Sequence, residues 1–139
     1  MVLFFDTNIL FYAVDGRFPE KQAIALSLYT QATTQGSFAT SAQVLSEFYN
    51  ATTKGIAPLL QCSQARIQVA SLARQRVVAT TASMVAQATA LAERHQLQWW
   101  DAMVLQAALS VGATCLYSED FQHGQRFDTL TTVNPFTTL

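Results

Sequence analysis

The hydrophobic residues of the chain form short runs separated by longer stretches with helical spacing. Val2 to Phe5 is a run of four apolar residues, which is too short for a helix and suits a fully buried strand. Similar short segments predict further strands at 37–40, 76–80, 113–117 and 130–133. Apolar positions with a helical period predict helices at 9–13, 19–34, 41–55, 63–74, 82–95 and 99–112. Hydroxyls at Thr40-Ser41 and at Ser63 are expected to cap the third and fourth of these helices.

Strands and helices alternate along the whole chain. This order is typical of βαβ units, in which parallel strands are joined by right-handed helical crossovers. We therefore predict an α/β protein with a three-layer α/β/α fold and a mainly parallel sheet of four to five strands. No internal repeat, low-complexity tract or long linker divides the sequence, so residues 1–139 are expected to form a single domain.

The composition limits the kind of protein that this sequence encodes. Of 139 residues, 50% are hydrophobic, enough for a core that needs no disulfide or structural zinc. Cys62 and Cys115 form no CxxC motif and are interpreted as free thiols in a reducing compartment. No stretch approaches the roughly 20 apolar residues of a membrane span, and the apolar start lacks the basic region of a signal peptide. We expect a cytoplasmic protein that does not enter a membrane.

Charge is sparse in this sequence. Only 12% of the residues are charged and the formal net charge is −1, so no broad basic surface is expected. Any nucleic acid must then be held locally, by a defined site. With so few charged residues, the position of each carboxylate is unusually informative.

Four acidic residues stand where polar side chains bind ligands or are costly to bury. Asp6 directly follows the first strand and Asp120 closely follows the strand at 113–117, and ligands of parallel sheets bind at such strand ends. Glu47 lies inside the apolar stripe of its helix, and Asp101 takes the first position of the buried face of another. Both are expected to point inward, where a carboxylate must be paired, hydrogen-bonded or metal-bound.

Convergence of these carboxylates would require a compensating charge. Two unit charges about 5 Å apart repel by about 3 kcal/mol at an effective dielectric near 20. The nearest basic residues in the sequence, Arg17 and Lys54, are not adjacent to any of the four acids. Because oxygen ligands are those that Mg²⁺ and Mn²⁺ prefer, a divalent metal site is the simplest solution.

Purely structural roles remain open for three of these residues. Asp6 and Asp101 can each serve as a helix cap, and Asp120 can be a turn residue beside Glu119. Glu47 has no capping role in the middle of a helix. The metal hypothesis therefore depends on the joint pattern and not on any single acid.

Several segments, distributed from the first strand to the last, resemble one known family, the PIN-domain ribonucleases and in particular VapC-like toxins. The similar segments are Met1–Leu10, Ser46-Glu47-Phe48, Trp100-Asp101-Ala102, Ser118–Gly124 and Val133–Phe136. The resemblance implies a compact and often dimeric α/β/α protein with an acidic pocket that binds Mg²⁺ or Mn²⁺ and cleaves RNA. It also implies a cognate antitoxin that blocks this pocket. The catalytic and metal-binding acids of the family correspond to Asp6, Glu47, Asp101 and Asp120.

The resemblance has one departure. Some members of the family carry a further acid three or four residues after the third one, where this chain has Val104 and Leu105. The number of metal ions, one or two, therefore stays open. We expect Thr7, Asn8 and Ser118 to orient the carboxylates or a metal-bound water from outside the ligand set.

Other polar and aromatic residues are given structural roles. His95 and His123 have no partner at a metal-ligand spacing and are predicted to be surface or capping residues. Trp99-Trp100 precedes a buried helix, so we predict that the pair belongs to the core, although such side chains can also stack on unpaired RNA bases. Cys115, within a strand, is predicted to be a small buried hydrophobic residue.

Three other functions were compared with a nuclease. A phosphoacceptor receiver domain is expected to have adjacent acids after the first strand and a lysine after a late strand, but Asp6 stands alone and no lysine follows Lys54. A phosphatase with an Asp-x-Asp motif is disfavoured because the second position after Asp6 is Asn8. A non-catalytic interaction module with a PIN-like fold is the remaining alternative, and the intact set of four acids argues against it.

Overall fold

The centre of the molecule is one six-stranded sheet. The computed structural model describes residues 1–139 and places the strands in the order β3-β2-β1-β4-β6-β5. All neighbouring strands are parallel except the antiparallel pair β5 and β6. The strands are β1 (Leu3–Phe5), β2 (Phe38–Ser41), β3 (Val77–Val78), β4 (Cys115–Tyr117), β5 (Arg126–Phe127) and β6 (Leu130–Val133).

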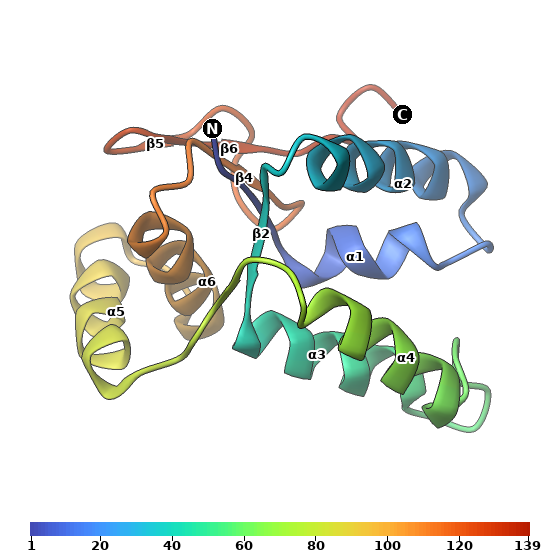
Figure 1. Cartoon of the computed structure of the whole chain (residues 1–139). Coiled ribbons are helices and arrows are strands. Elements are labelled where there is room, and N and C mark those ends of the chain that lie inside the picture. The colour runs from blue at the N-terminus through green and yellow to red at the C-terminus, as the bar shows by residue number, and fades with distance from the viewer.

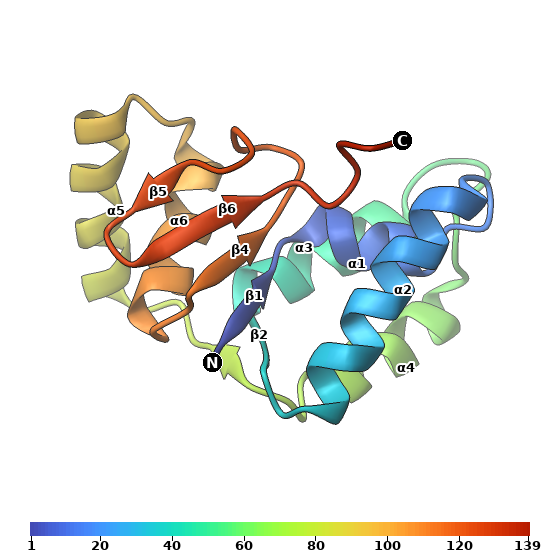
Figure 2. The same ribbon diagram turned by 90° about the horizontal axis from the view of Figure 1, so that it is seen from above.

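Six helices surround the sheet in two groups. The group α1–α4 and the pair α5–α6 lie on opposite sides of the strands β1 and β2 (Figures 1 and 2). No helix combines the length and hydrophobicity that crossing a membrane requires. The helices are α1 (Thr7–Ala13), α2 (Pro19–Thr34), α3 (Ala42–Thr53), α4 (Cys62–Leu72), α5 (Ala82–His95) and α6 (Trp99–Ser110).

The predicted α/β class and the mainly parallel sheet are confirmed, with one strand more than expected. The missed strand, β5, has only two residues, Arg126 and Phe127, and joins β6 through a tight hairpin. Asp128 closes this hairpin with φ 56°, in the left-handed region that short polar residues tolerate in two-residue turns. This strand was not recognisable in the sequence, because it is too short to show a periodic pattern and no Asn-Gly or Asp-Gly pair marks its turn.

The start of α4 also differs from the prediction. The helix begins at Cys62 instead of after a Ser63 cap, and Gln61 is the capping residue. The Gln64 side chain accepts a hydrogen bond from the Gln61 backbone N–H at 2.9 Å, which satisfies a donor that the first turn leaves unpaired. The predicted hydroxyl cap of α3 is present, since Ser41 Oγ accepts from the Val44 N–H, whereas Asp101 does not cap α6, whose capping position is Gln98.

The topology creates a crevice next to β1. β2 pairs with one side of β1 and is followed outward by β3, whereas β4 pairs with the other side of β1. Ligands of open parallel sheets bind at this kind of switch point, beyond the carboxyl ends of the strands. Phe4 and Phe5 are fully buried and fix β1 in the core, so the next residue, Asp6, emerges at that edge.

Candidate active site

Asp6 lies at the carboxyl ends of the parallel strands, directly after the central strand β1. Phe5 of β1 is in register with Tyr117 of β4, so the residues that follow, Asp6 and Ser118, lie side by side. Ser118 Oγ donates to Asp6 Oδ2 at 2.7 Å, and the Thr7 N–H donates to Asp6 Oδ1 at 2.7 Å. Asp6 therefore caps α1, as the structural alternative predicted, and also faces its neighbours across the switch point.

The environment of Asp6 disfavours its negative charge. Burial is the largest cause and raises its pKa from 3.8 to about 7, although the hydrogen bonds from Ser118 and Thr7 oppose this shift. The charges of Asp120 and Glu47 raise the pKa further. A bound cation would therefore stabilise the ionised form of Asp6.

Glu47 reaches the same edge from α3. Thr7 Oγ1 donates to Glu47 Oε2 and Gln43 Nε2 donates to Glu47 Oε1, both at 2.8 Å. The expectation that Glu47 points inward is only partly correct, because its side chain is half-buried. The buried face of α3 is formed by Val44, Leu45, Phe48 and Thr52, and Glu47 lies at the margin of that face.

Asp120 approaches from the loop after β4. Its side chain is exposed, and Asn8 Nδ2 donates to Asp120 Oδ2 at 3.1 Å. The Asp120 backbone N–H donates to Ser118 Oγ at 3.0 Å, so one hydroxyl bridges Asp6 and the Asp120 backbone. Partial loss of hydration beside the other acids is the largest cause that raises the pKa of Asp120, followed by the charge of Glu119 and then by that of Glu47.

Asp101 is less completely joined to the other three acids. Asp6, Glu47 and Asp120 line one cavity of about 300 Å³, and Asp101 does not line it. It occupies the first turn of α6 and is half-buried, so the expectation that it lies against the core is only partly correct, as for Glu47. Burial is the largest cause that raises the pKa of Asp101, followed by the charges of Asp120 and Glu47. The charges of Asp120 and Glu47 thus reach Asp101, although it lies outside the cavity that the other three acids line.

The other acids near this edge are neutralised within the chain. Arg17 pairs with Asp15 at 2.9 Å and Lys21 pairs with Glu119 at 3.3 Å. Neither of these ion pairs includes Asp6, Glu47, Asp101 or Asp120. Of the adjacent acids, Glu119 has a basic partner and Asp120 has none. Asp120 is the acid that corresponds to the family pattern.

The donor chemistry of the four acids suits a hard divalent cation. All their ligating atoms are carboxylate oxygens, the type that Mg²⁺ and Mn²⁺ prefer. In the arrangement shown, no three His, Cys, Asp or Glu side chains form a group that could hold a metal ion. Ser118 donates to Asp6, and Thr7 and Gln43 donate to the two oxygens of Glu47.

Removing the Ser118 hydroxyl should destabilise the chain. Ser118 is fully buried, and the change Ser118→Ala leaves Asp6 Oδ2 and the Asp120 N–H without this partner. We expect a loss of about 1–3 kcal/mol in the free energy of unfolding, measured by urea denaturation. Ser46→Ala, an exposed serine on α3, is the control and should have little effect. An equal stability of the two variants would contradict the bridging role of Ser118.

The predicted core position of Trp100 is wrong. Its side chain is 62% exposed, whereas residues 102–105 of the same helix are buried. Trp99 is half-buried. The first turn of α6 extends past the body of the core, so Trp100 lies at the surface in a second cavity next to Glu47.

Other polar residues behave largely as expected. Cys62 and Cys115 are free thiols, although Cys115 is half-buried and not fully buried. His95 is exposed and packs edge-to-face on Phe127 at 4.9 Å between ring centroids. His123 is exposed, and its Nδ1 accepts from the Asn134 N–H at 3.1 Å.

Two contacts at the site were not found from the sequence. Gln43 and Glu47 are four residues apart on α3, a spacing that brings side chains together and would have indicated this hydrogen bond. Lys21 donates to Glu119, 98 positions away in the sequence, and also to the Tyr12 hydroxyl. No local pattern predicts that pairing.

The fold and the acidic edge define an α/β protein with a candidate ligand site at the switch point of its sheet. Within this class, the chain belongs to the PIN domain family, whose model matches residues 3–126. This match confirms the resemblance found in the sequence. Val104 and Leu105, which replace the further acid of some members, are buried in α6.

Solved structures of VapC and related toxins share this fold. The VapC20 toxin of Mycobacterium tuberculosis, a sarcin-ricin loop cleaving toxin, is 21% identical with a TM-score of 0.66, covering 86% of this chain and 89% of its own. VapBC2 of Rickettsia felis, bound to a fragment of promoter DNA, is 17% identical with a TM-score of 0.64 and coverages of 95% and 97%. A toxin-antitoxin complex of Klebsiella pneumoniae is 18% identical with a TM-score of 0.66 and 98% of both chains covered. No functionally curated protein matches the sequence.

Proposed function

We propose that the protein is a metal-dependent endoribonuclease, a VapC-like toxin that hydrolyses RNA phosphodiester bonds. The observation that carries the proposal is the grouping of Asp6, Glu47 and Asp120 around one cavity, with Asp101 close enough for the charges of Asp120 and Glu47 to act on it. Membership of the PIN domain family and the shared fold with toxins support it.

The four carboxylates are proposed to hold Mg²⁺, with Mn²⁺ as the alternative ion. Such an ion would bind the scissile phosphate, lower the pKa of a bound water and stabilise charge on the leaving oxygen. The chain itself keeps the carboxylates in place. Ser118 and the Thr7 N–H fix both oxygens of Asp6, Thr7 Oγ1 fixes Glu47, and Asn8 fixes Asp120. These donors favour the ionised state that binds a cation.

The proposal extends to the partners of the protein. We assign RNA as substrate, a cognate antitoxin as inhibitor, a homodimer as the assembly and the cytoplasm as the location. The antitoxin assignment is supported by structural relatives that are toxin–antitoxin complexes. The RNA and its cleavage site are left to experiment.

Cleavage by the purified chain tests the proposal directly. We expect total bacterial RNA to be cut in the presence of Mg²⁺ or Mn²⁺ and to stay intact after addition of EDTA. Sequencing of RNA ends after brief expression, with Asp6→Asn as the matched control, would identify the substrate. The absence of both cleavage and Mn²⁺ binding in a calorimetric titration would favour a non-catalytic interaction module with the PIN fold.

A further inference from the structure

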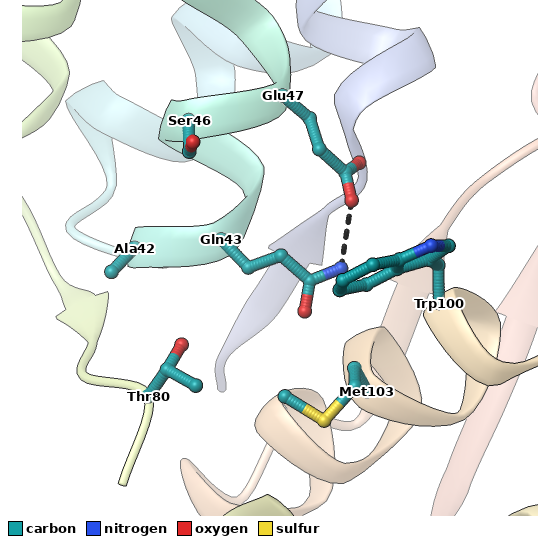
Figure 3. A pocket seen from close by; sticks show the side chains of 7 residues that line it. All are labelled: Ala42, Gln43, Ser46, Glu47, Thr80, Trp100 and Met103. Atoms are coloured by element: carbon teal, nitrogen blue, oxygen red, sulfur yellow. Dashed lines mark hydrogen bonds between the residues drawn. The ribbon is translucent and has the colours of Figure 1, made fainter.

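A second and larger cavity lies beside the carboxylate cavity. Its volume is about 700 Å³, within the range of sites that bind small molecules. Figure 3 shows side chains of α3 and α6 around it, with Thr80 from the segment after β3. The residues that line it are Ala42, Gln43, Ser46, Glu47, Thr80, Trp100 and Met103.

Glu47 connects the two cavities, because it lines both of them. One of its oxygens accepts from Thr7, on the side of Asp6, and the other accepts from Gln43, on the side of Trp100. Trp100 also directly precedes Asp101 in the sequence. A ligand with one group at the carboxylates therefore has its neighbouring group next to Trp100.

The side chains of the second cavity combine a flat apolar surface with polar edges. The exposed indole of Trp100, the Gln43 carboxamide and the Met103 side chain line the same cavity (Figure 3). Gln43 uses its amide nitrogen for Glu47, which leaves its carbonyl oxygen available as an acceptor. Ser46 and Thr80 add hydroxyls that donate or accept.

We propose that this cavity is a nucleobase subsite, in which an unpaired base of RNA stacks on Trp100. The edge of the base would meet the Gln43 carbonyl and the hydroxyls of Ser46 or Thr80. The inference rests on the proposed ribonuclease function, since a phosphodiester at Glu47 and Asp6 places the base of an adjoining nucleotide here. Base–aromatic stacking requires the base to be out of a duplex, so the substrate class is single-stranded or looped RNA.

Binding of short RNA to the Asp6→Asn protein in Mg²⁺ tests the subsite without cleavage. We expect Trp100→Ala to weaken the binding of a labelled single-stranded RNA, measured by fluorescence anisotropy, roughly 5- to 100-fold. Trp100→Phe keeps an aromatic face and should retain most of the affinity. The control Ile67→Ala, an exposed apolar residue of α4 outside both cavities, should leave the affinity unchanged.

Tryptophan fluorescence adds a readout that depends on contact with the base. In a Trp99→Phe background, Trp100 is the only tryptophan, and single-stranded RNA should quench its emission. A duplex of the same sequence should quench it much less. Unchanged emission with bound single-stranded RNA would overturn the stacking contact.

Kinetics separate this inference from the proposed function. In the chain with Asp6 intact, Trp100→Ala should raise KM for RNA more than it lowers kcat, and Trp100→Phe should restore KM. Cleavage that depends on Asp6 but has the same KM in Trp100→Ala would overturn the subsite alone. An absence of cleavage by the wild type would overturn the proposed function and the subsite with it. Size-exclusion chromatography must show the same assembly state for Trp100→Ala as for the wild type. A changed assembly state with unchanged RNA affinity would assign Trp100 to a protein interface and overturn the subsite.

Discussion

The change Asp6→Asn is expected to reduce RNA cleavage by at least about 100-fold while the chain stays folded. Loss of a carboxylate that positions a catalytic cation removes several kcal/mol of transition-state stabilisation, and each 1.36 kcal/mol corresponds to a tenfold change in rate. Asparagine keeps the size of the side chain and an oxygen for the Thr7 N–H, so the cap of α1 is preserved. The measurement is the initial rate of RNA cleavage in Mg²⁺, together with circular dichroism to verify folding.

Glu93→Gln is the matched control for this change. Glu93 is an exposed acid of α5 outside both cavities, and its loss alters the net charge by the same amount. We expect its cleavage rate to equal that of the wild type. Cleavage by Asp6→Asn at the wild-type rate would remove Asp6 from the catalytic machinery and, with it, the proposed site.

Most of the fold follows from local signals in the sequence. The helix bounds 19–34 and 82–95 were predicted correctly, and Pro19 at the start and Gly36 after the end are the local signals of the first. In the second, Thr81 caps the start and Gln96, with φ 54°, ends the helix. Strand β5 was missed because its two residues carry no periodicity, and only pairing with β6 makes it a strand. The start of α4 was misplaced because the Ser63 hydroxyl suggested a cap, whereas Gln61 is the capping residue and the Gln64 side chain accepts from its N–H.

Three of the four predicted acids, Asp6, Glu47 and Asp120, line one cavity, but their environment was not predicted. Asp6 and Asp120 were identifiable because parallel strands end at a common edge, which is a consequence of topology. The half-buried positions of Glu47 and Asp101 were not predictable, because an apolar stripe shows which face of a helix is buried but not where that face ends. Trp100 was misassigned for the same reason, since its helix is buried from the second turn while its first turn extends beyond the core.

Without divalent cations, the stability of the chain should fall as the pH rises from about 4 to 7. The pKa of Asp6 is about 7 in the folded state and 3.8 as the ordinary value, so in this range the folded chain holds a proton that the unfolded chain has released. Above pH 7 both states are ionised and the full cost of the buried charge is present, up to about 4 kcal/mol. The raised pKa values of Asp101 and Asp120 act in the same direction.

A bound cation should reverse this trend. Because it binds the ionised carboxylates, Mg²⁺ or Mn²⁺ at about 100 times its Kd should add about 2.7 kcal/mol to the free energy of unfolding. The gain should be larger at pH 8 than at pH 5.5, where Asp6 is protonated. Thermal unfolding in EDTA and in Mn²⁺ at both pH values measures these effects.

The Asp6→Asn variant isolates the contribution of one carboxylate to these curves. It carries no ionisable group at this position, so in EDTA it should be more stable than the wild type at pH 8, by about half as much at pH 5.5, and similar to it near pH 4. It should also lose most of the stabilisation by Mn²⁺, whereas Glu93→Gln should keep it. A wild type that is as stable at pH 8 as at pH 5.5 in EDTA, or that gains nothing from Mn²⁺, would contradict an uncompensated charge at the switch point of the sheet.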